Sequence, residues 1–330
     1  NALTDCTTGQ NNVCVGSNAG ENITTSENNV AIGHDAMEEN TTGNNNIAIG
    51  TRALEENTTS SNNTAVGYEA LTTNTTGASN TALGVQALQS NTTGERGVAV
   101  GGYALQSNTT GADNTAVGAN SLAAVTTGGN NTAVGRNALK LSSASNNTAV
   151  GKDALTANTT GADNTATGAN ALDANTTGSY NTAFGKHALT ANTTANYNTA
   201  FGTTSLYSNT TGTKNTTVGA DSLKQNTTAS NNTAIGYAAL NVNVTGADNT
   251  AVGQDALAAN LTNSNTAVGR YAMRANTTGT EQVAIGKGAL STNTTGSYNL
   301  AIGYNALDAN TTASNNLAIG YNALGANTTG

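Results

Sequence analysis

A seventeen-residue unit repeats along the chain and limits the folds that are open to it. The unit begins with Asn-Thr-Ala-Val-Gly, as at residues 63–67, and continues to Asn-Thr-Thr-Gly-Ala-Ser at residues 74–79. The glycine that closes the first motif recurs nineteen times, from Gly16 to Gly320, and two of the spacings are sixteen residues instead of seventeen. A fixed period of this length is typical of repeat proteins, in which each unit contacts only its neighbours. We therefore predict one uninterrupted repeat array over residues 1–330.

The first five positions of the repeat have the alternation of a short strand. Counting from the Asn that opens the unit, positions 2 and 4 are Thr64 and Val66 in the example, with Ala65 between them. Because successive side chains of a strand point to opposite faces, positions 2 and 4 share one face. We expect this face to point inward and the alanine to point outward. Gly67, at position 5, is expected at a corner that needs a positive φ or a close approach of the backbone.

A second apolar column lies at position 9, where sixteen of the nineteen repeats have Leu, and the Asn-Thr-Thr-Gly turn signal follows at positions 12–15. The density of Gly and Thr is too high for a helical repeat. The sequence thus predicts an all-β fold, a parallel β-solenoid or β-roll of about nineteen coils, each with two short strands. Stacked at about 4.8 Å, the coils would align like residues into ladders. The predicted ladder residues are Asn40, Asn57, Asn74, Asn91, Leu54, Leu71, Leu88, Val66 and Gly67.

The composition argues against several classes of protein. The 11 Lys and Arg residues face 19 Asp and Glu residues, a net charge of −8, so no basic stripe is present to bind nucleic acid. No apolar run approaches the roughly 18 residues of a membrane span. The two histidines, His34 and His187, lie in distant repeats without a triad or metal partner in the pattern. We expect neither enzymatic activity nor a cofactor.

Acidic residues and cysteines leave alternatives open. Five acidic residues gather in two consecutive repeats: Asp35, Glu38, Glu39, Glu55 and Glu56. A cation could bridge the stacked pairs, but no calcium-type Gly-Asp pattern repeats, and a solvated acidic face is the better interpretation. Cys6 and Cys14 occupy different positions of consecutive coils, so they are either two small buried thiols, a disulfide, or a bridge to another chain.

Threonine and asparagine suggest two further hypotheses. Asn-Thr-Thr is an N-glycosylation signal, as at Asn74, Asn91 and Asn158, although the same residues are expected to serve as turn and ladder residues. A flat array of Thr side chains could also bind ice. Against this, the consecutive threonines of the turn point to opposite faces, and we expect the Thr column at position 2 to face inward.

Sequence variation is concentrated at positions 6, 7, 16 and 17, and most of the tyrosines lie there. Exposed Tyr side chains suit the recognition of sugars or protein surfaces, whereas the alternative is neutral variation of exposed loops. The candidate recognition residues are Tyr68, Tyr103, Tyr237, Tyr271, Tyr304 and Tyr321.

The Asn-Val-Ala-Ile-Gly segment at residues 29–33 and the Glu-Gln-Val-Ala-Ile-Gly segment at residues 281–286 resemble the strand repeats in head domains of trimeric autotransporter adhesins. The full repeat, with Ala-Leu and Asn-Thr-Thr-Gly, is closer to repeats of proteins of the tail-fibre type. The resemblance covers essentially the whole chain and implies a left-handed, trimeric β-roll. The seventeen-residue period departs from the shorter period of adhesin heads, and the chaperone or anchor domain found in such proteins is not present in the sequence.

The array begins and ends in the middle of a repeat, which suggests an excised portion of a longer protein or a subunit whose ends other copies cover. Outward alanine columns would let copies pack closely. We therefore predict a structural or adhesive segment of an extracellular fibre, exposed on a virion or cell surface, that associates with itself as a homotrimer and contacts cell-surface glycans or proteins. The alternative is a filament of solenoids stacked end to end, and ice binding is a third hypothesis.

Overall fold

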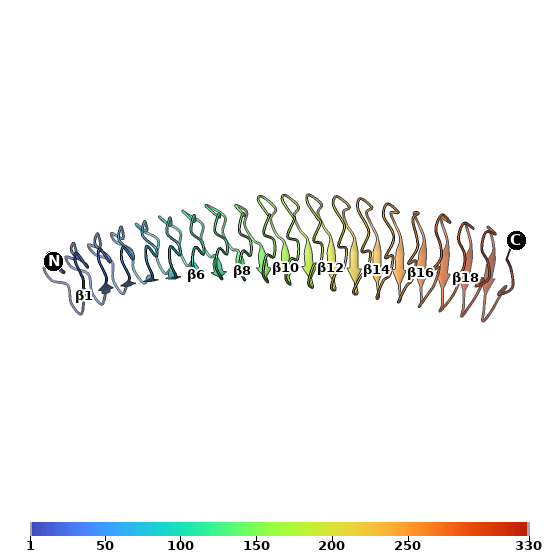
Figure 1. The fold of residues 1–330 in the computed structure, drawn as a ribbon, viewed down its shortest axis with the longest axis horizontal. Helices are drawn as coiled ribbons and strands as arrows, with labels where there is room; N and C mark the ends of the chain where they lie inside the picture. Colours follow the sequence, from blue (N-terminus) through green and yellow to red (C-terminus); the bar gives the residue numbers. More distant parts are fainter. Residues whose placement is uncertain (1, 329–330) are drawn as a thin grey trace. The chain divides into compact units, whose positions relative to one another are not determined.

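The computed structural model describes residues 2–328, and in these residues the protein is all-β, with nineteen parallel strands of three residues each (Figure 1). The chain divides into two compact units, Asn1–Asn164 and Thr165–Gly330. We call these the first and second unit and describe each by itself. Each unit is a β-solenoid with about seventeen residues per turn. The single array over residues 1–330 stays a prediction.

The first unit contains nine strands that pair in chain order, each parallel to the next and in register, so that Val66 lies opposite Leu83. These strands are β1 (Val13–Val15), β2 (Val30–Ile32), β3 (Ile47–Ile49), β4 (Thr64–Val66), β5 (Thr81–Leu83), β6 (Val98–Val100), β7 (Thr115–Val117), β8 (Thr132–Val134) and β9 (Thr148–Val150).

The second unit repeats this arrangement with ten strands, in which Ile235 lies opposite Val252. These strands are β10 (Thr165–Thr167), β11 (Thr182–Phe184), β12 (Thr199–Phe201), β13 (Thr216–Val218), β14 (Thr233–Ile235), β15 (Thr250–Val252), β16 (Thr266–Val268), β17 (Val283–Ile285), β18 (Leu300–Ile302) and β19 (Leu317–Ile319).

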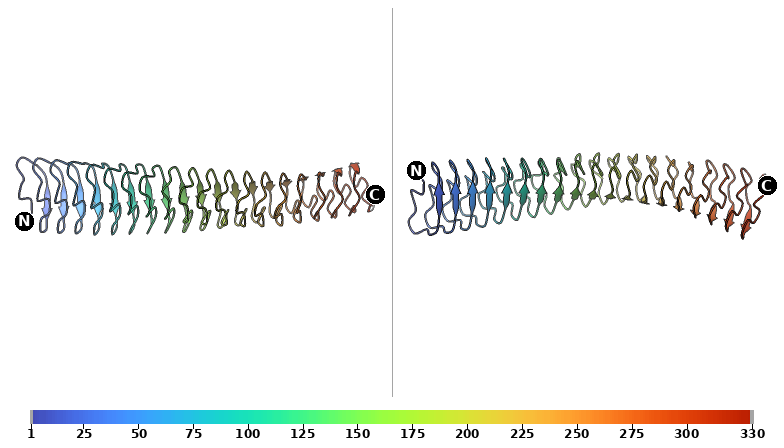
Figure 2. Two further views of the ribbon diagram at one scale, coloured as in Figure 1. Left: turned by 90° about the horizontal axis from the view of Figure 1, so that it is seen from above. Right: turned by 60° about the horizontal axis from the view of Figure 1, so that its bottom comes forward.

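Each coil has one strand, so the prediction of two strands per coil was wrong. The rest of each coil forms turns that are hydrogen-bonded to the adjacent coil (Figure 2). Leu71 belongs to such a turn, and its N–H donates to the carbonyl of Ala87 in the following coil at 2.9 Å. The residues at position 9 therefore stack in register from coil to coil, as strand residues do, although their backbone is not extended.

The strand faces are also the reverse of the prediction. Ala65 is fully buried, whereas its neighbours Thr64 and Val66 are partly exposed. Larger residues of the position-4 column are open to solvent, with Leu83 47% and Phe184 49% exposed. The interior of a seventeen-residue coil is narrow and takes small side chains at this position, alanine in most strands and the fully buried Thr217 in β13. In residues 2–328 the alanine column of the strands thus faces inward, and copies cannot pack closely through it.

The predicted leucine and asparagine ladders are confirmed. Leu54, Leu71 and Leu88 are fully buried and stack from coil to coil. Beside them runs the position-12 amide ladder: the Asn57 amide donates to Asn40 at 2.8 Å, and the next steps, Asn74 to Asn57 and Asn91 to Asn74, measure 3.0 and 2.8 Å. In the second unit, Asn226 donates to Asn209 at 2.7 Å in the same way. The interior of each coil is thus partly amide.

A second amide column, at position 1, was not predicted. Asn63 and Asn80 are buried, and the backbone N–H of Asn80 donates to Oδ1 of Asn63 at 2.9 Å. The side-chain amides of Asn80 and of Asn91, from the position-12 ladder, both donate to the carbonyl of Gly94, at 2.9 and 3.0 Å. The two columns therefore satisfy a backbone carbonyl that the narrow interior shields from water.

The left-handed residues lie at unexpected places. Gly67 has a φ of +137°, as predicted for the corner. In contrast, Gly77 of the Asn-Thr-Thr-Gly turn does not have a positive φ, and it is glycine because a Cβ would collide with the carbonyl of Gly94. The positive φ values of the turns belong to residues such as Glu69 (+52°) and Leu71 (+54°). A left-handed Leu costs about 1–2 kcal/mol, which its burial offsets.

One interruption of the position-12 ladder gives a testable prediction. Val125 takes the place of Asn in one coil and is fully buried, and Oδ1 of Asn108 in the preceding coil is buried without a hydrogen-bond donor. We expect Val125→Asn to supply that donor and to raise the free energy of unfolding by roughly 1 kcal/mol. Urea denaturation followed by circular dichroism measures the change.

The converse substitution is the control. Asn91→Val removes the donor to Asn74 and the acceptor for Asn108, which are 2.8 Å away on either side. It should lower the free energy of unfolding by about 1–3 kcal/mol. Equal stability of Val125→Asn and the unmodified chain would show that the amide ladder does not contribute to stability at that coil.

Candidate functional site

The first and third residues of the strands form an outward surface that we call the strand face. Its position-4 column is aliphatic or aromatic in eighteen of nineteen strands, with Thr167 as the exception. In the first unit Ile49 is 38% exposed, and in the second unit Ile285 is 40% exposed. The second unit also stacks the rings of Phe184 and Phe201 with centroids 4.9 Å apart. The strand face thus combines a partly exposed apolar column at position 4 with a column at position 2 that is mostly threonine.

The candidate tyrosines lie in the turns outside the strands. Three of them are exposed and make no ring contact: Tyr68, Tyr103 and Tyr237. Tyr304 and Tyr321 stack on each other with centroids 5.3 Å apart. The six candidate tyrosines are thus distributed over separate places of the two units, and among these six, within residues 2–328, only Tyr304 and Tyr321 stack on each other.

Tyr271 differs from the other candidates because cationic side chains cover it. The guanidinium groups of Arg270 and Arg274 lie 4.4 and 5.2 Å from its ring centroid. One coil further on, the ammonium group of Lys287 lies 5.3 Å from the ring centroid of Tyr304. The seventeen-residue spacing also stacks Tyr180 on Tyr197 at 5.0 Å, a pair that the periodicity could have revealed.

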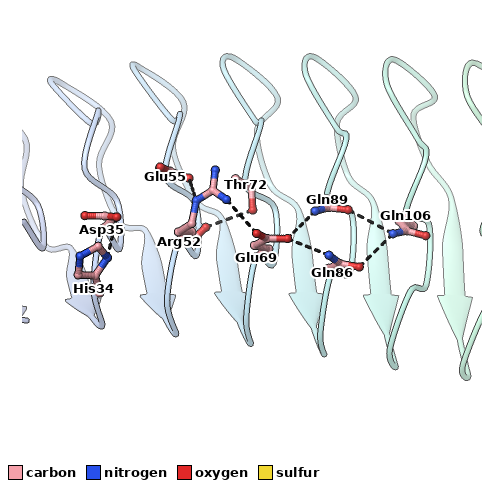
Figure 3. A network of polar contacts seen from close by, with 9 residues as sticks. All are labelled: His34, Asp35, Arg52, Glu55, Glu69, Thr72, Gln86, Gln89 and Gln106. Carbon is pink, nitrogen blue, oxygen red and sulfur yellow. Dashed lines mark hydrogen bonds and ion pairs between the residues drawn. The ribbon is translucent and has the colours of Figure 1, made fainter.

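A polar network crosses four coils of the first unit, from Arg52 to Gln106 (Figure 3). Its centre is Glu69, which is 8% exposed and accepts hydrogen bonds from Arg52 at 2.9 Å, Gln86 at 2.8 Å and Gln89 at 2.7 Å. The hydrogen bond from Gln86 is the largest cause that lowers the pKa of Glu69, and Tyr68 and Arg52 lower it further. The carboxylate is therefore held in its charged form.

The acidic residues near the N-terminus gather only in part. Carboxylate oxygens of Asp35, Glu38 and Glu55 lie within 4.8 Å of one another, whereas Glu39 and Glu56 are exposed outside this group. Partial burial, followed by the charges of Asp35, Glu39 and Glu55, raises the pKa of Glu38.

Nitrogen atoms of the protein already contact two of the three carboxylates. Asp35 is 2.6 Å from Nδ1 of His34 (Figure 3), and Glu55 accepts from Arg52 at 2.7 Å. Three carboxylates could ligate a hard cation such as Ca²⁺, but these contacts also suit the solvated acidic face.

The cysteines and the second histidine are separate from these groups. Cys6 and Cys14 are free thiols in the structure, and Cys6 donates to the carbonyl of Gly9 at 3.5 Å. Burial raises the pKa of Cys14, and the nearby Cys6 raises it further, so Cys14 is less reactive as a nucleophile than an ordinary thiol. His187 packs edge-on against Tyr207 at 6.2 Å.

The asparagines of the three candidate glycosylation sites belong to the buried amide ladder. Asn74, Asn91 and Asn158 are fully buried, and their side-chain amides donate to the carbonyls of Gly77, Gly94 and Gly161 at 2.9–3.0 Å. A glycan needs this same amide nitrogen at the protein surface. The folded coils therefore exclude modification at these three residues.

No protein-family model, curated protein or solved structure matches this chain. In residues 2–328 no helix is long and apolar enough to cross a membrane. The case for a function therefore depends on the strand face and on the side chains that the turns present.

The two unusual glutamates give opposite predictions for pH. The lowered pKa of Glu69 stabilises the fold above the ordinary value of 4.5, and this contribution is lost as the pH falls through the lowered value. The raised pKa of Glu38 means that its charged form destabilises the fold at neutral pH, and protonation relieves this cost as the pH falls through the raised value. Glu69→Gln should lower the melting temperature at neutral pH, and Glu38→Gln should raise it.

Thermal unfolding of both variants should be followed from neutral pH to well below pH 4.5. Both differences from the unmodified protein should shrink toward the acidic end. A constant difference for Glu69→Gln over that range would show that hydrogen-bond geometry, and not charge, determines its effect.

Proposed function

We propose that this chain is a segment of an extracellular fibre, in which three copies pack through their strand faces and present the turn residues for attachment. The exposed aliphatic column of the strand face is the observation that carries the proposal. Tail-fibre-type proteins and the head domains of trimeric autotransporter adhesins, which the repeats resemble, suggest the trimer, the left-handed coil and the location on a virion or cell surface.

Hydrophobic burial provides the driving force for this assembly. Residues such as Ile49 and Ile285 leave more than a third of their surface in water. Covering each would contribute on the order of 1 kcal/mol. Similar side chains recur in the column at every strand except β10, which has Thr167. Because in-register pairing aligns the column, a copy that fits one coil also fits its neighbours. A structural role follows, with rigidity supplied by the amide and leucine ladders.

Attachment would use the turn residues that remain exposed when the strand faces are covered. Tyr68, Tyr103 and Tyr237 lie outside the strands, and their rings present an apolar face with a polar hydroxyl. Such side chains are suited to sugars and to protein surfaces. We propose cell-surface glycans or proteins as the partners, and no enzymatic step, cofactor or nucleic acid is part of this function.

Sedimentation equilibrium tests the assembly. The purified chain should have three times the mass of one copy, and electron microscopy should show discrete particles. Ile49→Lys and Ile235→Lys place a charge on the strand face of each unit and should shift the protein to a single copy, because burying an unpaired charge is costly. Gln254→Lys, at an exposed turn, is the control and should leave the mass unchanged.

Other outcomes distinguish the alternatives. Long polymers that persist in both lysine variants would favour the filament stacked end to end. A single copy in the unmodified protein would contradict the trimer.

Ice binding is a second candidate because the position-2 threonines face outward, contrary to the prediction. Seven successive strands of the second unit begin with Thr: Thr165, Thr182, Thr199, Thr216, Thr233, Thr250 and Thr266. All are exposed or partly exposed, and in-register pairing aligns their hydroxyl groups. The adjacent column carries Phe184 and Phe201 and makes this face uneven, so we place the fibre first.

Thermal hysteresis measures ice binding directly. If the threonine column binds ice, the unmodified protein should depress the freezing point below the melting point, and Thr233→Lys should abolish the gap. Thr211→Lys, which alters an exposed turn threonine of the same unit, should preserve it. A protein without hysteresis contradicts this candidate.

A further inference from the structure

A groove with a volume of about 610 Å³ lies on the turns of the second unit. Its lining includes Tyr271, Arg274, Lys287, Ser291, Asn305 and Asp308. None of the lining residues belongs to a strand, so the groove and the strand face are different surfaces. Its volume is within the range of ligand-binding pockets, roughly 300–1,000 Å³.

Glycine at one position of the repeat helps to shape the groove. Gly288 lies at position 7, where the preceding and following coils have Tyr271 and Asn305. It has a φ of +71°, a left-handed conformation that the tyrosine and the asparagine also adopt, at +63° and +49°. Backbone geometry therefore does not require glycine there. The missing side chain leaves space into which the Asn305 side chain reaches.

Two side chains that line the groove, Arg274 and Lys287, are cationic. Within residues 2–328, ion pairs with carboxylates are formed by four of the eleven Lys and Arg residues: Arg52, Arg96, Lys152 and Lys224. Cations of the first unit, such as Arg52 and Arg96, contact carboxylates at 2.7 Å. In contrast, neither Arg274 nor Lys287 forms an ion pair with any residue in the range 2–328. Both are exposed, and cation–π contacts with Tyr271 and Tyr304 hold them near the groove. In a chain with a net charge of −8, this is a local excess of positive charge.

We propose that this groove binds a saccharide that carries a carboxylate or sulfate group. Arg274 offers a planar guanidinium for bidentate contact with the acidic group, and Lys287 adds a second charge. The hydroxyl of Ser291, the amide of Asn305 and the carboxylate of Asp308 are donors and acceptors for sugar hydroxyls. The saccharide would lie across consecutive coils. The assignment rests on the attachment role proposed above and specifies its ligand class.

A glycan array tests the assignment with the full chain as probe. The array should carry oligosaccharides in carboxylated, sulfated and neutral versions of the same backbones. We expect binding to acidic members only, with affinity that falls as salt is raised. The strongest member is then titrated calorimetrically against the variants.

Three substitutions locate the site. Arg274→Gln and Lys287→Gln should each weaken binding roughly tenfold or more, because each removes a charge-assisted contact. Gly288→Asn adds the side chain that the following coil has at this position, where it is Asn305. Because Asn305 also has a left-handed φ, the backbone at residue 288 can accept asparagine, and the added side chain should block the groove. Lys214→Gln, an exposed lysine outside the groove, is the control with the same change of charge. Melting temperatures verify that each variant folds.

The outcomes separate this assignment from the proposed fibre. Binding that is equal in the three groove variants and in the unmodified protein overturns the groove and leaves attachment elsewhere on the chain. An array without preference for acidic members overturns the ligand class. The mass of the same samples by sedimentation reports on the trimer independently of either result.

Discussion

The buried amides are the constraint on which the rest of the structure depends. An Asn side chain inside a coil is shielded from water, so its donors and acceptor must find partners within the protein. The partners come from the adjacent coils, as when Asn74 donates to Asn57 at 3.0 Å. This requirement fixes the height and the register of each coil relative to the next. Some replacements keep a polar atom, as Ser142 does when it accepts from Asn158 at 3.2 Å, whereas Val125 leaves Oδ1 of Asn108 without a donor.

With the amides in place, little room is left inside for anything larger than one leucine and two alanines per coil. Ala65, Ala70 and Leu71 fill that space and are fully buried. The branched residues of the strands are consequently displaced to the outer surface, although they are the most β-prone and among the most apolar residues of the repeat. The same constraint that makes the interior polar thus exposes an apolar column on one outer surface, the surface through which the proposed assembly would form.

Periodicity alone predicted the parallel solenoid, the leucine column and the position-12 amides, because stacking identical units aligns identical residues. It could not orient the strand. In Thr64-Ala65-Val66 the pattern allows either the alanine or its two neighbours to face the interior. The rule that apolar residues are buried favours valine over alanine as the inner residue. The width of the coil reverses that choice, and the width depends on contacts among turns that no local pattern specifies. The position-1 amides were overlooked for the same reason, since Asn63 precedes a strand and is expected in a loop.

Periodicity does not predict the candidate binding residues, because these depend on which side chains lie seventeen residues apart at the variable positions. Arg96 and Asp113 neutralise each other across one coil step at 2.7 Å. Arg274 has Ser291 at the equivalent position of the next coil and pairs with no carboxylate in residues 2–328. Because the coils stack in register, a single substitution places a new side chain beside the equivalent residues of the two adjacent coils, whose positions the fold fixes. A groove such as the one at Gly288, which combines a local excess of positive charge with a missing side chain, requires only a few such substitutions and no change of fold.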